Sequence, residues 1–419
     1  MERLEQLTAG YIKIGEAAER FGVSARRVQA LCAKGRIAGA VQVGREWLIP
    51  ADTKKPADGR TRAERSAGEE DMPLPRKTPF LSMTDLYRTA GKADEVARTL
   101  ADNHEAQVLF EAFIAYSRGE IDRVYEKASY LLGKHSGFYA ILSAGMLLAQ
   151  CAIWQGDIAM WRRAKIHIAE APAKSDIDRD VMLLSISAVD IMLYSVDSFP
   201  AWFKSGCFAP LPDDALPAAS VYYAKYLYAA AYAVATGSQR LEGVERLSLM
   251  SMIPATLEPL ISWVRAGKTI MAEIYLRLTC ATAYHLSGND GEACRHIDRA
   301  LALALPDRLY GVLAEYCRAL DTLMEKRLSP LDGAAWAQVK QLYKTYGEGW
   351  ARLSGHVRGR TVVTTLTPKQ REIAKLAAFG LSNREIAEKL DMSLAGIKQA
   401  LLAITDKLGV GRDRFAAFL

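Results

Sequence analysis

Residues 366–419 carry the pattern that constrains the fold most, because the same helix-start motif occurs there twice. Thr367 is followed three positions later by Gln370, and Ser382 is followed in the same way by Glu385. A hydroxyl at an N-cap and a long polar side chain three residues on satisfy backbone N–H groups reciprocally. The spacing therefore predicts two successive short helices, each beginning at such a capping box.

A third helix is predicted from Leu394, after a turn formed by residues 391–393. Apolar side chains recur at helical spacing on one face of this segment. The predicted buried stripe is Ile397, Leu401, Ile404 and Leu408. Lys398, Gln399 and Lys407 remain on the outer face. Two helices joined by a short turn, the second of them long, indicate a helix-turn-helix of a size that fits the major groove of DNA.

The residue order over 366–409 resembles the LuxR/FixJ family of DNA-binding domains: Leu-Thr-Pro, Arg-Glu-Ile, Gly-Leu-Ser-Asn-Arg-Glu-Ile-Ala and Lys-Leu-Gly follow one another. The resemblance implies that Lys398 and Gln399 face bases or backbone and that Arg384 touches phosphate. It also implies a dimer contact through a fourth helix, Asp413–Leu419. The candidate DNA contacts of this domain are Arg384, Lys398, Gln399 and Lys407.

Two residues depart from the usual pattern of that family. Gly396 stands where threonine is common, and Ala400 where histidine is common. Glycine inside a helix costs roughly 1 kcal/mol against alanine, so Gly396 is expected to weaken the reading helix. These departures bear on the preferred DNA sequence and leave the fold prediction unchanged. A domain kept only for dimerisation is the alternative.

A second DNA-binding unit is predicted in residues 1–52. A short helix ends near Gly22, and Ser24 caps the next one, which turns Arg26, Arg27 and Gln29 outward. Apolar residues then alternate with polar or small ones about Gly44-Arg45, which predicts a β-hairpin wing. The combination resembles the excisionase/MerR-type winged domain. By that resemblance the DNA contacts are Ser24, Arg26, Arg27, Gln29 and, from the wing, Arg45.

Basic charge is concentrated in the two end regions. Residues 1–65 contain 13 Lys and Arg against 8 Asp and Glu, a net charge of +5, and residues 351–419 contain 12 against 6, a net charge of +6. Because the whole chain carries +6, the stretch between them carries −5. Phosphate binding is driven largely by the release of counterions, so this distribution favours double-stranded DNA as the partner of both end regions.

The remaining segments are assigned by composition and period. Residues 53–78 are charged and contain prolines without apolar periodicity, which predicts a flexible linker. Residues 79–350 follow a helical pattern almost throughout. Residues 351–365 are predicted as a second linker, before the LuxR-like domain of residues 366–419.

Internal similarity predicts the architecture of the central block. Two helices joined by a glycine turn recur about Gly119, Gly156 and Gly288, and more loosely about Gly237. These segments resemble degenerate tetratricopeptide (TPR) repeats, at irregular intervals that leave the repeat count open. Stacked helix pairs leave a concave face that commonly binds protein or ligand. The five tyrosines within residues 222–232 either line such a groove or pack between helices, and packing is favoured.

No enzymatic chemistry is predicted. Residues 266–269 imitate the tail of a phosphate-binding loop, but Ser262 stands at the first glycine position and no strand precedes it. The six histidines and six cysteines are scattered along the chain. Cys280, Cys294 and Cys317 are predicted to be buried thiols rather than ligands of a zinc site. We expect no catalytic residue, no metal and no cofactor.

The sequence shows neither a secretory leader nor an apolar run of eighteen residues, which predicts a cytoplasmic protein with reduced cysteines and no membrane partner. The predicted fold is mainly all-α: a TPR-like helical-repeat central domain flanked by two helix-turn-helix domains. The predicted function is that of a homodimeric bacterial transcription regulator, controlled by a protein or small-molecule effector bound to the central domain. The alternative is a non-enzymatic interaction scaffold with vestigial DNA-binding modules, which Gly396 and Ala400 favour.

Overall fold

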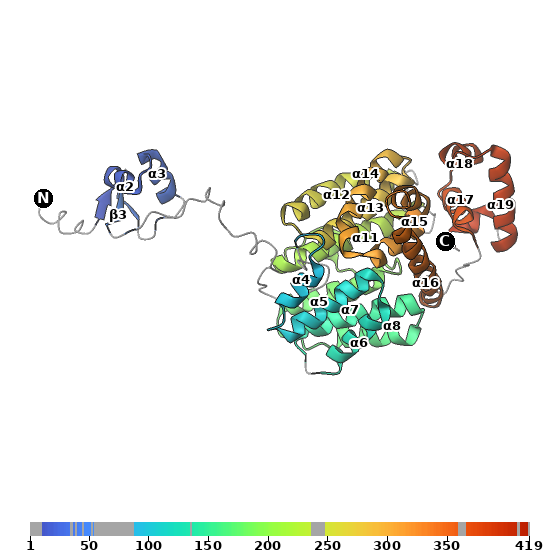
Figure 1. Cartoon of the computed structure of the whole chain (residues 1–419), viewed down its shortest axis with the longest axis horizontal. Coiled ribbons are helices and arrows are strands. Elements are labelled where there is room, and N and C mark those ends of the chain that lie inside the picture. The colour runs from blue at the N-terminus through green and yellow to red at the C-terminus, as the bar shows by residue number, and fades with distance from the viewer. Residues whose placement is uncertain are drawn as a thin grey trace, which may run out of the picture. The chain divides into compact units, whose positions relative to one another are not determined.

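The computed structural model describes residues 11–33, 37, 40–43, 46–51, 53, 88–134, 136–235, 248–358, 366–408 and 411–417. The chain divides into two compact units, Met1–Glu70 and Asp71–Leu419, and each is described by itself. The structure is mainly helical, with one small sheet in the first unit (Figure 1). The predicted fold class is therefore confirmed.

The first unit is a helix-turn-helix followed by a two-stranded wing. Its elements are β1 (Tyr11–Lys13), α2 (Ile14–Phe21), α3 (Ala25–Ala33), β2 (Val41–Val43) and β3 (Glu46–Pro50). The strands form an antiparallel sheet in the order β1-β3-β2, in which Tyr11 pairs with Pro50 and Val43 pairs with Glu46. Phe21, Val28 and Ile49 are buried between the helices and the sheet. The predicted hairpin is thus confirmed, and Trp47 packs partly buried against this core.

The central helices occupy most of the second unit (Figure 1). They are α4 (Ala93–Thr99), α5 (His104–Arg118), α6 (Ile121–Leu132), α7 (Phe138–Gln155), α8 (Ile158–Ala169), α9 (Asp176–Ile191), α10 (Ala201–Lys204), η1 (Asp213–Ala215), α11 (Leu216–Ala235), α12 (Ser248–Ala266), α13 (Ile270–Leu286), α14 (Asp290–Ala304), η2 (Leu305–Asp307), α15 (Tyr310–Leu328) and α16 (Gly333–Arg358). Together these helices bury one continuous apolar core.

Glycine turns join successive helices where the sequence predicts them. Gly119 and Gly156 follow α5 and α7 with φ angles of 86° and 66°, a left-handed conformation that favours glycine. Each turn lets the next helix, α6 or α8, pack against the one before it. Gly288 plays the same part between α13 and α14, while the predicted turn at Gly237 lies outside the described residues. The helix pairs agree with the predicted hairpins, and their assignment as TPR-like repeats stays a prediction.

One predicted boundary is wrong. Residues 351–365 are not a linker throughout, because α16 continues to Arg358. Ala351, Leu353 and Ser354 in this last part of α16 are buried, so packing extends the helix beyond the predicted end of the central domain. The predicted linker of residues 53–78 lies outside the described residues apart from Thr53.

Helix α7 is long and apolar enough to cross a membrane by length and composition. However, 78% of its apolar window is buried inside the protein, among the neighbouring helices. Helices α5, α6, α8, α9 and α16 all pack against it. Its apolar composition is therefore accounted for by its place in the core.

Candidate nucleic-acid interface

The last part of the second unit is a small helical domain with its own core. Its elements are α17 (Pro368–Ala378), α18 (Asn383–Lys389), α19 (Leu394–Leu408) and the 3₁₀ helix η3 (Arg412–Ala417). The predicted stripe of α19 is buried as expected, and Ile397 and Ile404 are fully covered. Phe415 of η3 is also fully buried in this core, so the segment predicted to pair with a second subunit contributes to packing within the domain.

Both predicted capping boxes are present. Thr367 Oγ1 accepts a hydrogen bond from the Gln370 backbone N–H at 3.2 Å, and the Thr367 N–H donates to Gln370 Oε1 at 3.2 Å. At the second box the Ser382 N–H donates to Glu385 Oε2 at 2.6 Å, and this bond lowers the pKa of Glu385. These short-range bonds set the starts of α17 and α18, and so fix where the turn of the helix-turn-helix begins.

Gly396 lies in the first turn of α19, not in its interior. Its backbone N–H donates to Ser393 Oγ at 3.0 Å, and a Cβ atom at this position would lie 3.1 Å from the same oxygen. First-turn N–H groups have no partner within the helix, so this bond caps the helix. The expectation that Gly396 weakens the reading helix as an interior glycine is therefore corrected, because the residue accommodates the cap.

All four predicted DNA contacts of this domain are exposed to solvent, and three of them are unpaired among the described residues. Arg384 on α18 and Lys398 and Gln399 on α19 are exposed. Within the described part of the chain these three side chains make no hydrogen bond or ion pair, which leaves them available to a ligand. Lys407 is exposed as well, but its Nζ donates to Gln370 Oε1 at 2.8 Å and ties the end of α19 to the start of α17.

Two exposed leucines on α19 were missed by the sequence reasoning. Leu402 is 67% exposed one helical turn after Lys398, and Leu394 is 41% exposed at the start of the helix. On a helix in the major groove, apolar side chains contact thymine methyl groups. Leu402 adds an apolar side chain to the outward face of α19 that carries Lys398 and Gln399. The sequence could have indicated the exposure of Leu402, because it follows Lys398 by four positions and so lies on the same face of the helix. The neighbouring Leu401 belongs to the buried stripe, and the two leucines were not distinguished.

Residues 364–418 match the family of bacterial regulatory proteins described as the luxR family. The carboxyl-terminal domain is a LuxR-family domain. Residues 11–53 match a family described as a helix-turn-helix domain. No curated protein and no solved structure matches the chain. The matches confirm both predicted domains, and two helix-turn-helix domains make the protein a DNA-binding regulator.

In the amino-terminal domain the predicted contacts lie on α3 and in the wing. Ser24, Arg26 and Gln29 are exposed. The Arg27 side chain and the whole of Arg45 lie outside what the structure describes. Arg26 and Gln29 lie on α3, and Ser24 directly precedes this helix, so the three exposed residues lie close together in the chain.

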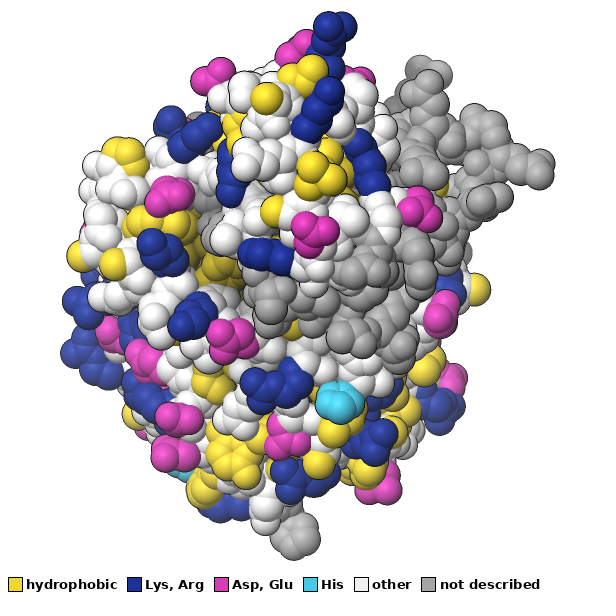
Figure 2. All heavy atoms as spheres, turned by 90° about the vertical axis from the view of Figure 1, so that its right-hand side faces the viewer, with side chains coloured by type: hydrophobic (Ala, Val, Ile, Leu, Met, Phe, Trp, Pro, Cys, Tyr) yellow, Lys and Arg dark blue, Asp and Glu magenta, His cyan; other side chains and the backbone are white. Residues whose placement is uncertain are grey.

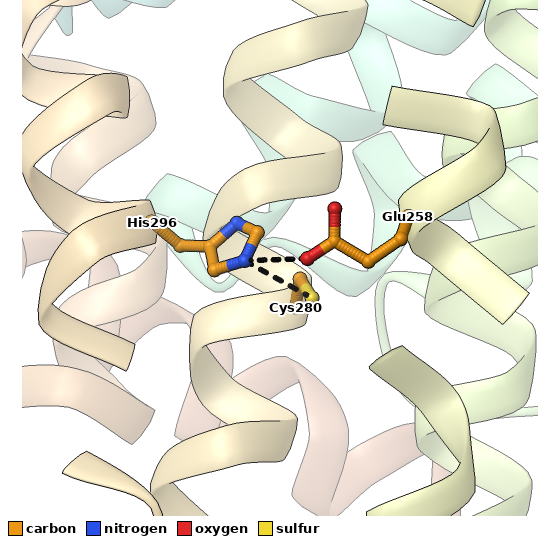
Figure 3. Close-up of side chains that lie close together, drawn as sticks. All are labelled: Glu258, Cys280 and His296. Carbon is orange, nitrogen blue, oxygen red and sulfur yellow. Dashed lines mark hydrogen bonds and ion pairs between the residues drawn. The ribbon is translucent and has the colours of Figure 1, made fainter. Parts of the chain in front are cut away.

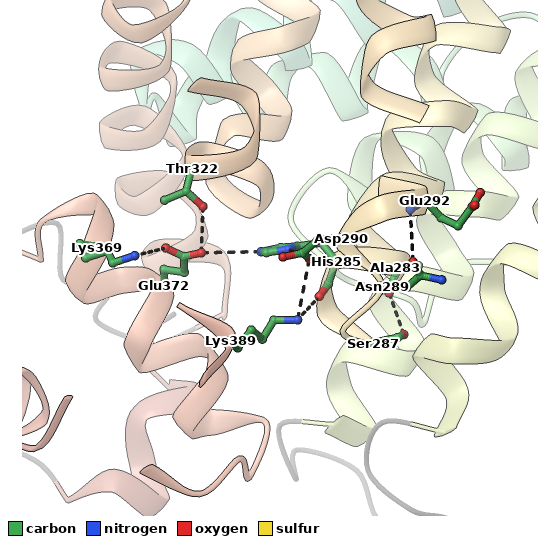
Figure 4. A network of polar contacts seen from close by, with 10 residues as sticks. All are labelled: Ala283, His285, Ser287, Asn289, Asp290, Glu292, Thr322, Lys369, Glu372 and Lys389. Atoms are coloured by element: carbon green, nitrogen blue, oxygen red, sulfur yellow. Dashed lines mark hydrogen bonds and ion pairs between the residues drawn. The ribbon is translucent and has the colours of Figure 1, made fainter. Parts of the chain in front are cut away.

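The LuxR-family domain is docked against the central helices through α17 and α18 (Figure 4). Glu372 of α17 accepts a hydrogen bond from Thr322 Oγ1 at 2.9 Å, and the same carboxylate oxygen lies 3.8 Å from His285 Nε2. Lys369 Nζ lies 3.6 Å from the other oxygen of Glu372. Lys389 donates to the His285 backbone carbonyl at 2.5 Å, and burial lowers the pKa of this lysine.

Further contacts extend this docking surface on either side of Glu372. Arg371 donates to the Tyr343 hydroxyl, and the rings of Phe379 and Tyr232 meet edge to face with centroids 5.5 Å apart. Asp290 lies 4.0 Å from Lys389 Nζ; although burial raises its pKa, hydrogen bonding to His285 and nearby positive charges hold it below the ordinary value. Helix α19 makes none of these contacts, and so its outer face stays open.

The face of the second unit that carries the LuxR-family domain is shown in Figure 2. Lys and Arg side chains project from the upper part of this face, with Asp and Glu side chains between them. Mixed charge of this kind attracts phosphate less strongly than a uniformly basic face.

Among the residues that the structure describes, one group of possible metal ligands forms in the tertiary structure, although the sequence predicted none. Glu258 of α12, Cys280 of α13 and His296 of α14 place one donor atom each within 4.8 Å of one another (Figure 3). His296 Nε2 lies 3.0 Å from Glu258 Oε1 and 3.8 Å from Cys280 Sγ. These donor types suit zinc. Cys294 and Cys317 do not join the cluster.

The surroundings of this cluster favour a hydrogen-bonded core group over a metal centre. Burial raises the pKa of Cys280 to about 12, which keeps the thiol protonated. His296 Nδ1 is buried without a hydrogen-bond partner among the described residues, whereas a metal-bound histidine almost always donates its second ring N–H. The pair formed by His296 and Glu258 accounts for the contact without an ion.

Proposed function

We propose that the protein is a transcription regulator that reads duplex DNA with α19 of its LuxR-family domain. The observation that carries the proposal is the exposure of Arg384, Lys398 and Gln399, unpaired among the described residues, on an otherwise closed helix-turn-helix core. Arg and Lys bind phosphate and guanine edges, and Gln binds adenine edges. The outer face of α19 thus offers both positioning and base-reading groups.

The amino-terminal domain is proposed as a second, MerR-like DNA-binding module, with Ser24, Arg26 and Gln29 on its reading helix. We infer a homodimer, because two LuxR-family domains on half-sites about one helical turn apart would double the contacts to DNA. A cytoplasmic location is part of the same proposal. The central helices are proposed as a TPR-like effector domain without enzymatic activity. The docking contacts through Glu372 and Lys389 support this division, since they join the effector domain to the DNA-binding domain.

Lys398→Ala is expected to weaken DNA binding by about tenfold and to reduce the slope of log affinity against log salt by about 1 if the side chain contacts phosphate. The side chain is exposed and unpaired in the described structure, so its removal leaves the fold intact. Binding of the selected site is measured by fluorescence anisotropy at several salt concentrations. Lys340→Ala, an exposed lysine of α16, removes the same charge and is expected to bind like wild type.

The DNA site used in this measurement is identified by selecting genomic fragments that bind the intact protein. A discrete enriched motif, bound with steep salt dependence and weakened by Lys398→Ala, supports the proposal. Further weakening by Arg26→Ala would show that the amino-terminal domain binds as well. Weak, sequence-independent binding in all conditions would instead favour the interaction scaffold.

A further inference from the structure

The central helices enclose a cavity that the proposed function leaves unassigned. Its walls come from helices far apart in the sequence, among them α5, α11, α13, α15 and α16. Polar and aromatic side chains line it, including Tyr116, Lys225, Thr279, Glu315, Arg318 and Trp350. The space amounts to about 70 Å³. One water needs roughly 10 to 15 Å³ of such space, so the cavity holds about five to seven waters or one small ring compound.

Among the described residues of the cavity wall, Glu315 carries the one carboxylate, and it is already neutralised. Lys225 Nζ lies 3.5 Å from the Oε2 atom of Glu315, and the Glu315 side chain is only 7% exposed. Its Oε1 atom accepts hydrogen bonds from the hydroxyls of Tyr116 and, at 3.3 Å, Tyr275. Burial, together with the charge of Glu315, raises the pKa of both tyrosines well above the ordinary value, which keeps their hydroxyls neutral donors. Glu315 and Lys225 therefore form a closed pair.

Arg318 is the charge in the wall that remains uncompensated. Its guanidinium carbon lies 3.6 Å from the centroid of the Trp350 ring, a cation–π contact that holds it in place. Across the residues that the structure describes, Arg318 makes no hydrogen bond and no ion pair. Trp350 is itself fixed, because its Nε1 donates to the Met192 carbonyl at 2.8 Å. The cavity thus presents one oriented cation beside aromatic walls.

We propose that this cavity binds a small aromatic carboxylate, with its anionic group on Arg318 and its ring among the tyrosines and Trp350. A carboxylate matches the two parallel N–H donors of a guanidinium, and its negative charge balances the positive charge of Arg318. The flat aromatic walls suit a planar body of one ring. This inference rests on the proposed function, in which the central domain takes an effector, and names the chemical class of that effector.

The same arginine connects the cavity to the docking surface. Arg318 and Ala319 of α15 line the cavity, and they also line a narrow gap that faces Glu372 and Arg371 of the docked α17. The Oε2 atom of Glu372 is buried and has no hydrogen-bond partner among the described residues. Positive charge nearby stabilises such a carboxylate, and here it comes from Lys369 Nζ, 3.6 Å from this atom, and from Arg318 in the same gap. A bound anion that neutralises Arg318 removes one of these two charges, so ligand binding is expected to weaken the docking of α17.

The ligand test uses the full-length protein without DNA. Benzoate and phenylacetate are titrated by calorimetry and by tryptophan fluorescence, which Trp350 makes sensitive to the site. At least one acid is expected to bind saturably, and its neutral amide at least about tenfold more weakly. Binding of none of the acids up to about 10 mM, or equal binding of acid and amide, overturns the proposal.

Arg318→Met keeps the length of the side chain and removes its charge, and is expected to weaken binding of the acid by about tenfold or more. Arg318→Lys retains the charge and is expected to recover part of the affinity, which separates loss of charge from loss of fold. Arg295→Met is the control, because this arginine is 76% exposed on α14. Unchanged binding by a folded Arg318→Met variant contradicts the proposed site.

Linkage to docking is read by hydrogen exchange of the amides of α17 in the same DNA-free protein. The bound acid is expected to raise exchange there in wild type and not in Arg318→Met. Unchanged exchange on saturation overturns the coupling. Both readouts are independent of DNA, so failure here leaves the DNA-binding proposal standing, and absence of a DNA motif leaves the ligand site testable.

Discussion

Ile397→Asp is expected to unfold the LuxR-family domain and abolish its DNA binding, while the central helices stay folded. Ile397 is fully buried at the centre of a small core, so the new carboxylate has neither water nor a partner. Burial of an unpaired acid costs on the order of 5 kcal/mol. A domain of residues 364–418 has a total stability of only about 3 to 8 kcal/mol, at ~0.05–0.15 kcal/mol per residue.

The expected result is measured by limited proteolysis and by the binding of a selected DNA site. The domain should become protease-sensitive, whereas most of the helical circular dichroism remains, since the central helices do not depend on this core. Ala395→Asp is the matched control on the same helix. Ala395 is exposed in the first turn of α19, where an acid is favourable, so this variant should stay folded. Protease resistance equal to wild type in Ile397→Asp would contradict the assigned core.

Gly349→Ala is expected to destabilise the central domain by about 2 kcal/mol or more, although alanine favours helix formation. A Cβ atom at Gly349 would lie 2.2 Å from the Trp154 carbonyl oxygen and 2.3 Å from that of Ile153. Both obstacles are backbone atoms of α7, so relief requires that α16 move away from α7. Overpacking of this kind typically costs about 1 to 3 kcal/mol and occasionally more.

Gly347 supplies the control two residues earlier in the same helix. A Cβ atom there meets only the Tyr343 ring, at 3.6 Å, which is an ordinary contact. Gly347→Ala is therefore expected to raise stability by up to about 1 kcal/mol through helix propensity. Thermal and urea unfolding of the two variants should shift in opposite directions. Shifts in the same direction would show that α16 and α7 are not packed at Gly349.

Much of the DNA-binding site follows from short-range rules that are legible in the sequence. The capping boxes at Thr367 and Ser382 and the buried stripe of α19 depend on residues within a few positions of one another. These rules placed Lys398 and Gln399 outside correctly. They also placed Lys407 outside, but they did not predict its bond to Gln370, which joins residues that are 37 positions apart. They failed at Gly396, whose role depends on which turn of α19 it occupies.

The cavity and the docking surface had no comparable signal. Arg318 looks like an ordinary helical charge in the sequence, and its isolation beside Trp350 arises only when α15 packs on α16. The end of the central domain was likewise misplaced, because burial of Leu353 against other helices decides how far α16 runs. Among the tyrosines of α11, Tyr222 is fully buried between helices and Tyr228 reaches the cavity, a difference that no local pattern records.

The sequence by itself determined the helix starts, the turns, the two helix-turn-helix domains and the exposed groups on their reading helices, because these depend on hydrogen bonds and periodicity over a few residues. The tertiary structure alone decided which charges are left unpaired. Lys225 finds Glu315 across 90 positions, whereas Arg318 finds no acid among the described residues. Pairing of buried charges depends on distances between helices, and only the packed fold sets those distances.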